Sequence, residues 1–131
     1  MKLLLDTHIW LWSVLEPNRL ARRVEKALRD PANELWLSPV SVGELVVLLR
    51  KGRLKLPNDV ASWVAKTIED LQINEAPLTV EVALGISSLD FRHGDPADHF
   101  IAATARVLDL TLVTADERLL NVPRIRVLAN R

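Results

Sequence analysis

Short apolar runs that end at polar residues alternate along this chain with stretches of helical periodicity. The first run covers residues 3–5 and ends at Asp6, and similar runs cover 35–37, 73–76, 110–113 and 125–127. Such short runs are typical of buried strands. Helical patterns separate them at 9–15, 19–29, 39–50, 57–71, 79–89, 96–108 and 117–120. The alternation predicts a Rossmann-like α/β fold, with a parallel sheet sandwiched by helices.

Capping residues and turns support this division into elements. Side chains that accept hydrogen bonds from free backbone N–H groups, or prolines that fit a first turn, precede most of the predicted helices. We expect the starts to be Asn18 for 19–29, Pro39 or Ser41 for the helix that runs to about Arg50, Pro57 and Asn58 for 57–71, Thr79 for 79–89, and Asp95 with Pro96 for 96–108. Residues 91–94 are expected to form a loop.

Composition adds limits to this picture but does not indicate a function. At 131 residues and 49% hydrophobic content, residues 1–131 are expected to form a single domain with a substantial core. A net charge of zero neither indicates nor excludes a nucleic-acid partner. There is no cysteine, and the apolar run near the N-terminus is too short for a signal peptide or a membrane span. We therefore expect a cytoplasmic protein without disulfides or membrane attachment.

Four acidic residues occupy positions where a carboxylate needs an explanation. Asp6 and Asp116 follow predicted strands, and Glu44 is the sole acid of a helix that is apolar on most of its circumference. Asp98 lies on the helix stripe that is expected to face the sheet, together with apolar residues at helical spacing. Each also has an ordinary interpretation: Asp6 and Asp116 as cap or turn residues, Asp98 as a first-turn acid, and Glu44 as an acid that faces a water-filled gap. For Asp95 the cap is the better interpretation.

Taken together, the four acids predict a metal site at one edge of the sheet. In a parallel sheet all four could meet beyond the carboxyl ends of the strands. Clustered carboxylates repel one another unless a cation neutralises them, and oxygen ligands alone favour Mg²⁺ or Mn²⁺ over zinc. Such ions can activate water and hold a phosphate. We assign none of the three histidines as a ligand, and no glycine-rich phosphate loop is present.

Four segments that contain these acids resemble the PIN domain, and more closely the VapC-type toxins of toxin–antitoxin pairs. In order they read LLDTH at residues 4–8, SPVSVGEL at 38–45, DPADHFIAATA at 95–105 and LVTAD at 112–116. The resemblance therefore extends over the whole chain. It implies a metal-dependent endoribonuclease toxin that cleaves RNA with a metal-activated water, an antitoxin partner and a homodimer.

The resemblance also assigns roles to individual residues. It makes Asp6, Glu44, Asp98 and Asp116 the catalytic and metal-binding quartet, with Glu44 contacting the ion directly or through water. It places Thr7 and Thr114 beside the metal, and it matches Asp95 to a frequent additional acid. His99 stands where relatives usually carry arginine.

Two further features have open interpretations. The basic residues Arg50, Lys51, Arg53 and Lys55 follow the Glu44 helix, and they either bind RNA phosphates or form an ordinary solvated surface. Trp10 and Trp12 make the first helix apolar on several faces, which fits either core packing or a partner surface.

Two other functions are alternatives to a metal-dependent ribonuclease. One is a catalytically silent PIN-like module that only binds RNA or protein, although such a module has no reason to keep four costly carboxylates. The other is a phosphatase with Asp6 as nucleophile, but the second residue after Asp6 is His8 rather than the aspartate that this class requires.

Overall fold

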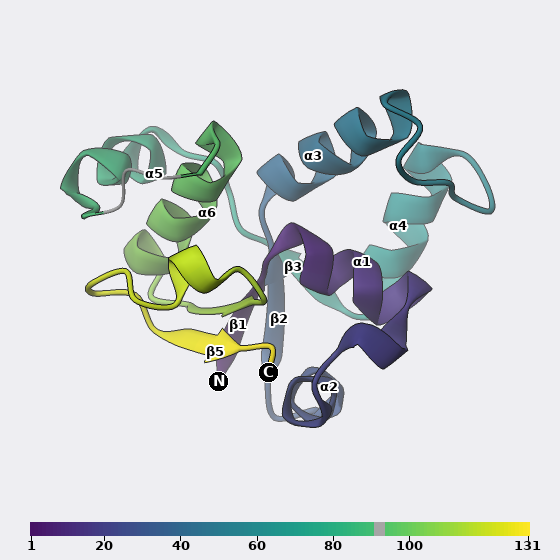
Figure 1. Ribbon diagram of the computed structural model, residues 1–131, viewed down its shortest axis with the longest axis horizontal. Helices are drawn as coiled ribbons and strands as arrows, with labels where there is room; N and C mark the ends of the chain where they lie inside the picture. The colour runs from purple at the N-terminus through teal and green to yellow at the C-terminus, as the bar shows by residue number, and fades with distance from the viewer. Residues whose placement is uncertain (91–93) are drawn as a thin grey trace.

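The computed structural model describes residues 1–90 and 94–131, and in these ranges the strands form one five-stranded parallel sheet (Figure 1). The strand order is β3-β2-β1-β4-β5, and every neighbouring pair is parallel. The predicted Rossmann-like sheet is thus confirmed. The strands are β1 (Lys2–Leu5), β2 (Glu34–Leu37), β3 (Ile73–Glu75), β4 (Thr111–Thr114) and β5 (Val127–Ala129).

Helices cover both faces of the sheet. The α-helices are α1 (Thr7–Leu15), α2 (Arg22–Arg29), α3 (Pro39–Arg50), α4 (Val60–Asp70), α5 (Val80–Gly85) and α6 (Pro96–Val107). Short 3₁₀ turns are η1 (Pro17–Arg19), η2 (Ile86–Ser88) and η3 (Glu117–Leu119). Because side chains alternate between the faces of a strand, Leu3 and Leu5 join the core beneath α1 to α4, whereas Leu4 joins the core beneath α6.

The chain order places a natural binding position between β1 and β4. From β1 the chain proceeds outward to β2 and β3, and it then returns to β4 on the other side of β1. Connections therefore diverge at the carboxyl ends of β1 and β4, which is where ligands bind in open α/β sheets. Helix α3 contacts both α1 and α6, so its side chains can reach the same edge.

Several element boundaries differ from the sequence-based expectation. The helix expected at 19–29 is split into η1 and α2, and its cap is Ala21 rather than Asn18, because Pro17 begins a separate 3₁₀ turn. The side chain of Asn130 accepts a hydrogen bond from the Ala21 N–H at 2.6 Å, so the C-terminal segment holds the residue that precedes α2. Helix α4 begins only after Asp59, whose carboxylate accepts the N–H of Ser62.

Two other differences lie in the C-terminal half of the chain. The helix expected at 79–89 has the predicted cap Thr79, but it tightens into η2 after Gly85. At Gly85 a Cβ atom would meet the Val107 side chain at 2.9 Å, so close packing of α5 on α6 requires glycine. Strand β5 begins two residues later than expected, because a turn with Arg124 at φ 67° precedes it. Of the loop expected at 91–94, residues 91–93 lie outside the described residues.

Within the described residues, no helix combines the length and the apolar character needed to cross a membrane.

Candidate active site

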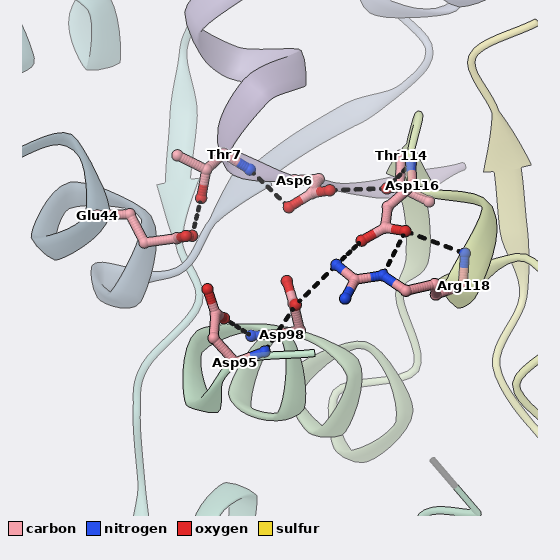
Figure 2. A network of polar contacts seen from close by, with 8 residues as sticks. All are labelled: Asp6, Thr7, Glu44, Asp95, Asp98, Thr114, Asp116 and Arg118. Carbon is pink, nitrogen blue, oxygen red and sulfur yellow. Dashed lines mark hydrogen bonds and ion pairs between the residues drawn. The ribbon is translucent and has the colours of Figure 1, made fainter. Parts of the chain in front are cut away.

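Asp6 is the most deeply buried of the four predicted acids, with 8% of its surface exposed. It continues the β1 ladder, since its N–H donates to the Val113 carbonyl at 3.0 Å, and its side chain caps α1. Its carboxylate accepts the Thr7 N–H at 2.8 Å and the Thr114 hydroxyl at 2.7 Å (Figure 2). Burial nevertheless raises the pKa of Asp6, because these two hydrogen bonds do not fully replace lost solvation.

Asp116 approaches the same point from the end of β4. Its N–H donates to the Thr114 hydroxyl oxygen at 3.0 Å, so Thr114 links the two acids. The carboxylate receives the Arg118 guanidinium in a bidentate pair, with Nε 3.1 Å from Oδ1 and NH2 2.7 Å from Oδ2. The hydrogen bonds from Arg118 hold the pKa of Asp116 below its usual value of 3.8.

Asp98 is positioned by the first turn of α6. Asp95 caps this helix as predicted, and the two residues form a reciprocal capping box: the Asp98 N–H donates to Asp95 and the Asp95 N–H donates to Asp98 Oδ2. Gly94 adopts φ 84°, and a Cβ there would collide with the Asp98 carboxylate. Burial and then the Asp95 charge raise the pKa of Asp98, although Arg118 lies within 3.4 Å.

Glu44 reaches the site from α3. The Thr7 hydroxyl lies within hydrogen-bonding distance of Glu44 Oε1, and 2.8 Å from the Ser41 hydroxyl. Burial raises the pKa of Glu44, the hydrogen bond with Thr7 opposes this, and the charges of Asp95, Asp6 and Asp98 add to it. The apolar circumference of this helix suggested that it would be buried, but only Ser41 and Leu45 of α3 are fully buried, and Val47 is 46% exposed.

The four predicted acids line one pocket of about 340 Å³. Figure 2 shows their carboxylates directed toward a common centre from β1, α3, α6 and the end of β4, and we call this space the acid pocket. Among the described residues it is lined by Asp6, His8, Trp12, Glu44, Asp95, Asp98, Ala115, Asp116 and Arg118. Thr7 and Thr114 support it through their hydrogen bonds to Glu44 and Asp6.

The donor set of the acid pocket suits a hard divalent cation. All its anionic ligands would be carboxylate oxygens, and burial, with the charges of neighbouring acids added to it, raises the pKa of Asp6, Glu44 and Asp98. As they stand, no three His, Asp or Glu side chains among the described residues are grouped closely enough to hold a metal ion. The guanidinium of Arg118 instead supplies positive charge between Asp98 and Asp116.

The predicted basic residues lie beside this pocket rather than in it. Lys51 and Arg53 line a neighbouring groove of about 700 Å³ together with Glu44 and Asp95. Arg53 also lines a second groove with Lys55. Arg50 is exposed and lines neither groove.

Sequence reasoning missed Arg118, His8 and Trp12 as parts of the site. Arg118 follows Asp116 by two residues, and the η3 turn brings its guanidinium onto the Asp116 carboxylate. Its contact with Asp98, however, depends on tertiary structure. The position of His8 directly after Asp6 and Thr7 was the available signal for its place in the lining.

Comparisons with known proteins agree with this geometry. The PIN domain family model matches residues 3–125. Ribonuclease VapC22 of Mycobacterium tuberculosis is 36% identical over 117 residues, with 88% of each chain covered.

Solved structures provide a comparison at the level of the fold. The structure of VapBC2 from Rickettsia felis bound to a promoter DNA fragment matches with a TM-score of 0.73 at 17% identity, and 98% of each chain is covered. DNA-bound VapBC from Salmonella typhimurium matches with a TM-score of 0.69 at 19% identity, covering 100% of this chain and 99% of that one. With the family model spanning nearly its full length, this chain belongs to the PIN domain family.

Proposed function

We propose that this protein is a divalent-metal-dependent ribonuclease and the toxin of a toxin–antitoxin pair. The observation that carries the proposal is the convergence of Asp6, Glu44, Asp98 and Asp116 on one pocket at the carboxyl ends of β1 and β4. The similarity to a protein named a ribonuclease supports the nuclease activity. Three buried or half-buried acids with raised pKa values are far more costly in a structural role than in a cation site.

Mg²⁺ or Mn²⁺ is the proposed cofactor. Asp6, Asp98 and Asp116 would hold it, and Glu44 would contact it directly or through water. When bound, such an ion supplies positive charge to the phosphate oxygens and lowers the pKa of water.

The residues around the pocket have distinct tasks in this proposal. Thr114 and the Thr7 N–H fix both oxygens of Asp6, while the Thr7 hydroxyl orients Glu44. Arg118 must give up its contact with Asp98 when a cation takes its place. Because the guanidinium is exposed, it can then turn toward a substrate phosphate, a group that arginine binds well.

The neighbouring cations extend the site toward the RNA backbone. Lys51 and Arg53 lie in the groove that includes Glu44, and Arg53 and Lys55 lie in the next one. Phosphate contacts from such residues position nucleic acid without reading its sequence. Reversing the charges of Arg53 and Lys55 should therefore weaken RNA binding and reduce its salt dependence.

An antitoxin and a second copy of the chain are the proposed protein partners. The two solved structures described above are VapBC assemblies, and another match, VapBC-5 from Mycobacterium tuberculosis, is a member of a family of toxin–antitoxin systems. Leu78, Val80 and Leu84 expose apolar side chains at and before α5, and a homodimer could bury them. Sedimentation of wild type and Val80→Asp tests the dimer, since dissociation of the variant alone is the expected result.

The decisive test of the nuclease is RNA cleavage by purified protein with Mg²⁺ or Mn²⁺. Wild type should cleave, and EDTA or the Asp98→Ala change should abolish cleavage while the protein remains folded. Asp70→Ala is the matched control, because Asp70 is an exposed acid on α4. Full cleavage by Asp98→Ala would remove the proposal.

The alternative is a silent PIN-like module that binds RNA or protein. The observation in its favour is the pairing of Arg118 with Asp98 and Asp116, which partly fills the cation position. RNA binding without cleavage under any divalent ion would establish it.

A further inference from the structure

A second groove opens directly beside the acid pocket. It measures about 670 Å³ and lies between α1 and the segment after α3, and we call it the α1 groove. His8 and Trp12 line both spaces, so the two are continuous along one turn of α1. A chain that lies across the four carboxylates therefore meets these two rings next.

The α1 groove combines an aromatic wall with positive charge. Trp12 is partly exposed, His8 is exposed, and their rings lie 5.7 Å apart at an interplanar angle of 52°. The Arg19 guanidinium lies 4.3 Å from the centre of the Trp12 ring. Arg53 and Lys55 add further positive charge, and Glu16 is the one acid that the described part of the chain contributes to the lining.

This composition differs sharply from that of the acid pocket, and it matches one class of ligand. Sites for single-stranded nucleic acid combine aromatic rings that stack on bases with cations that follow the phosphates. Bases also stack on arginine planes. A polypeptide could use the four leucines that the described residues contribute to the groove, Leu11, Leu15, Leu48 and Leu54. Three cations against one acid among these residues nevertheless favour a polyanion.

We propose that the α1 groove binds the nucleotide next to the scissile phosphate, with its base stacked on Trp12 and the tilted His8 ring beside it. Arg19, Arg53 and Lys55 bind the phosphates that flank this base. Arg19 exchanges its contact with Trp12 and its exposed pair with Glu16 for a phosphate, at little cost because the pair is about half exposed on both sides. The inference rests on the proposed ribonuclease function and adds a stacking subsite to it.

The experiment measures fluorescence anisotropy of labelled single-stranded oligoribonucleotides, with all proteins in the Asp98→Asn background so that no cleavage occurs. Trp12→Leu should weaken binding by roughly 5- to 100-fold, the range for loss of one stacked base, whereas Trp12→Phe should retain most of the affinity. Since Trp12 also packs against the core, thermal denaturation of each variant accompanies the binding data.

An abasic scan separates stacking from a structural role. Oligonucleotides that lack one base at successive positions should bind the parent protein more weakly at one position. That same position should have no effect on Trp12→Leu. Equal losses in both proteins, or a loss at no position, would overturn the proposal.

A matched pair of arginines tests the phosphate contacts. Arg19 and Arg29 are both exposed and each is paired with a glutamate on its own helix or turn, but only Arg19 lines the groove. Arg19→Gln should reduce the slope of log affinity against log salt by about 0.7, and Arg29→Gln should leave it unchanged.

The remaining outcomes separate the subsite from the function. If Trp12→Leu leaves RNA affinity unchanged while wild type still cleaves RNA, the subsite is wrong and the nuclease stands. If the change instead weakens only a complex with a protein partner, the groove is a protein-docking surface. A parent protein that neither binds nor cleaves RNA would contradict the function itself.

Discussion

The two walls of the acid pocket hold their carboxylates by different means. On the sheet wall, Asp6 is buried and receives hydrogen bonds from a backbone N–H and from Thr114, which is fully buried. The opposite wall, which we call the helix wall, consists of Asp98 on α6 and Asp116, which caps η3; both are more exposed, and they share the guanidinium of Arg118. The sheet wall is a fixed anchor because neutral donors in β4 and at the start of α1 hold it. The helix wall is compensated by a side chain that another cation can replace.

The largest effect should come from displacing Asp98. Gly94→Ala places a Cβ against the Asp98 carboxylate at a backbone angle that alanine disfavours. Misplacement of a catalytic group on this scale should lower the cleavage rate by roughly 10- to 100-fold. Gly52→Ala is the control, since Gly52 has a similar φ of 68° but open space around its Cβ position. Similar rates in both variants would show that Gly94 does not position Asp98.

Next in size is the loss of the hydroxyl that anchors Asp6. Thr114→Val keeps the shape of a buried side chain but removes the donor to Asp6 and the acceptor for the Asp116 N–H. A hydrogen bond to a charged group contributes about 1.5–3 kcal/mol, so urea unfolding should show a loss of that order. Thr111→Val in the same strand should change stability far less, because no hydrogen bond of its hydroxyl is found within the described residues. Equal losses would mean that Thr114 contributes only packing.

A smaller effect is expected on the helix wall. Arg118→Gln removes the positive charge that competes with a cation, so Mn²⁺ affinity should rise by about two- to fivefold, the scale of an exposed ion pair. Calorimetric titration with Mn²⁺ measures it. Arg126→Gln, which breaks the exposed pair with Asp109, is the control and should leave Mn²⁺ affinity unchanged. Weaker Mn²⁺ binding by Arg118→Gln would place the guanidinium among the groups that support the ion.

The smallest expected effect is a change in the pH dependence of stability when Glu44 is replaced. Because the folded protein raises the pKa of Glu44 above 4.5, folded protein holds this proton more tightly than unfolded protein does. The contribution of Glu44 to stability is therefore full below pH 4.5, and it falls as pH rises through the raised pKa. In EDTA, Glu44→Gln should match wild type in acid and be more stable at neutral pH, as thermal unfolding can measure. A Glu44→Gln protein that is less stable than wild type at neutral pH would contradict burial as the cause of the raised Glu44 pKa.

Much of the fold followed from the sequence because strand and helix periodicities are local. The four acids could also be found, since each interrupts an apolar pattern or directly follows a strand. What could not be predicted depends on distant partners. Asn130 binds the Ala21 N–H before α2, Arg118 reaches Asp98, and Trp12 joins the acid pocket to the α1 groove only once the chain is folded. The predicted start of α4 was also wrong, because Asn58 and Asp59 are both good N-caps and the local pattern does not choose between them.

The most direct test of the central claim, that these carboxylates form one cation site, is Mn²⁺ binding measured by calorimetry on wild type, Asp6→Asn and Asp98→Asn. Wild type should bind Mn²⁺ at the acid pocket, and both changes should weaken the same binding event by at least about tenfold. The two residues lie on opposite walls, so a shared loss requires a shared ion. Unchanged Mn²⁺ affinity in either variant would contradict the claim.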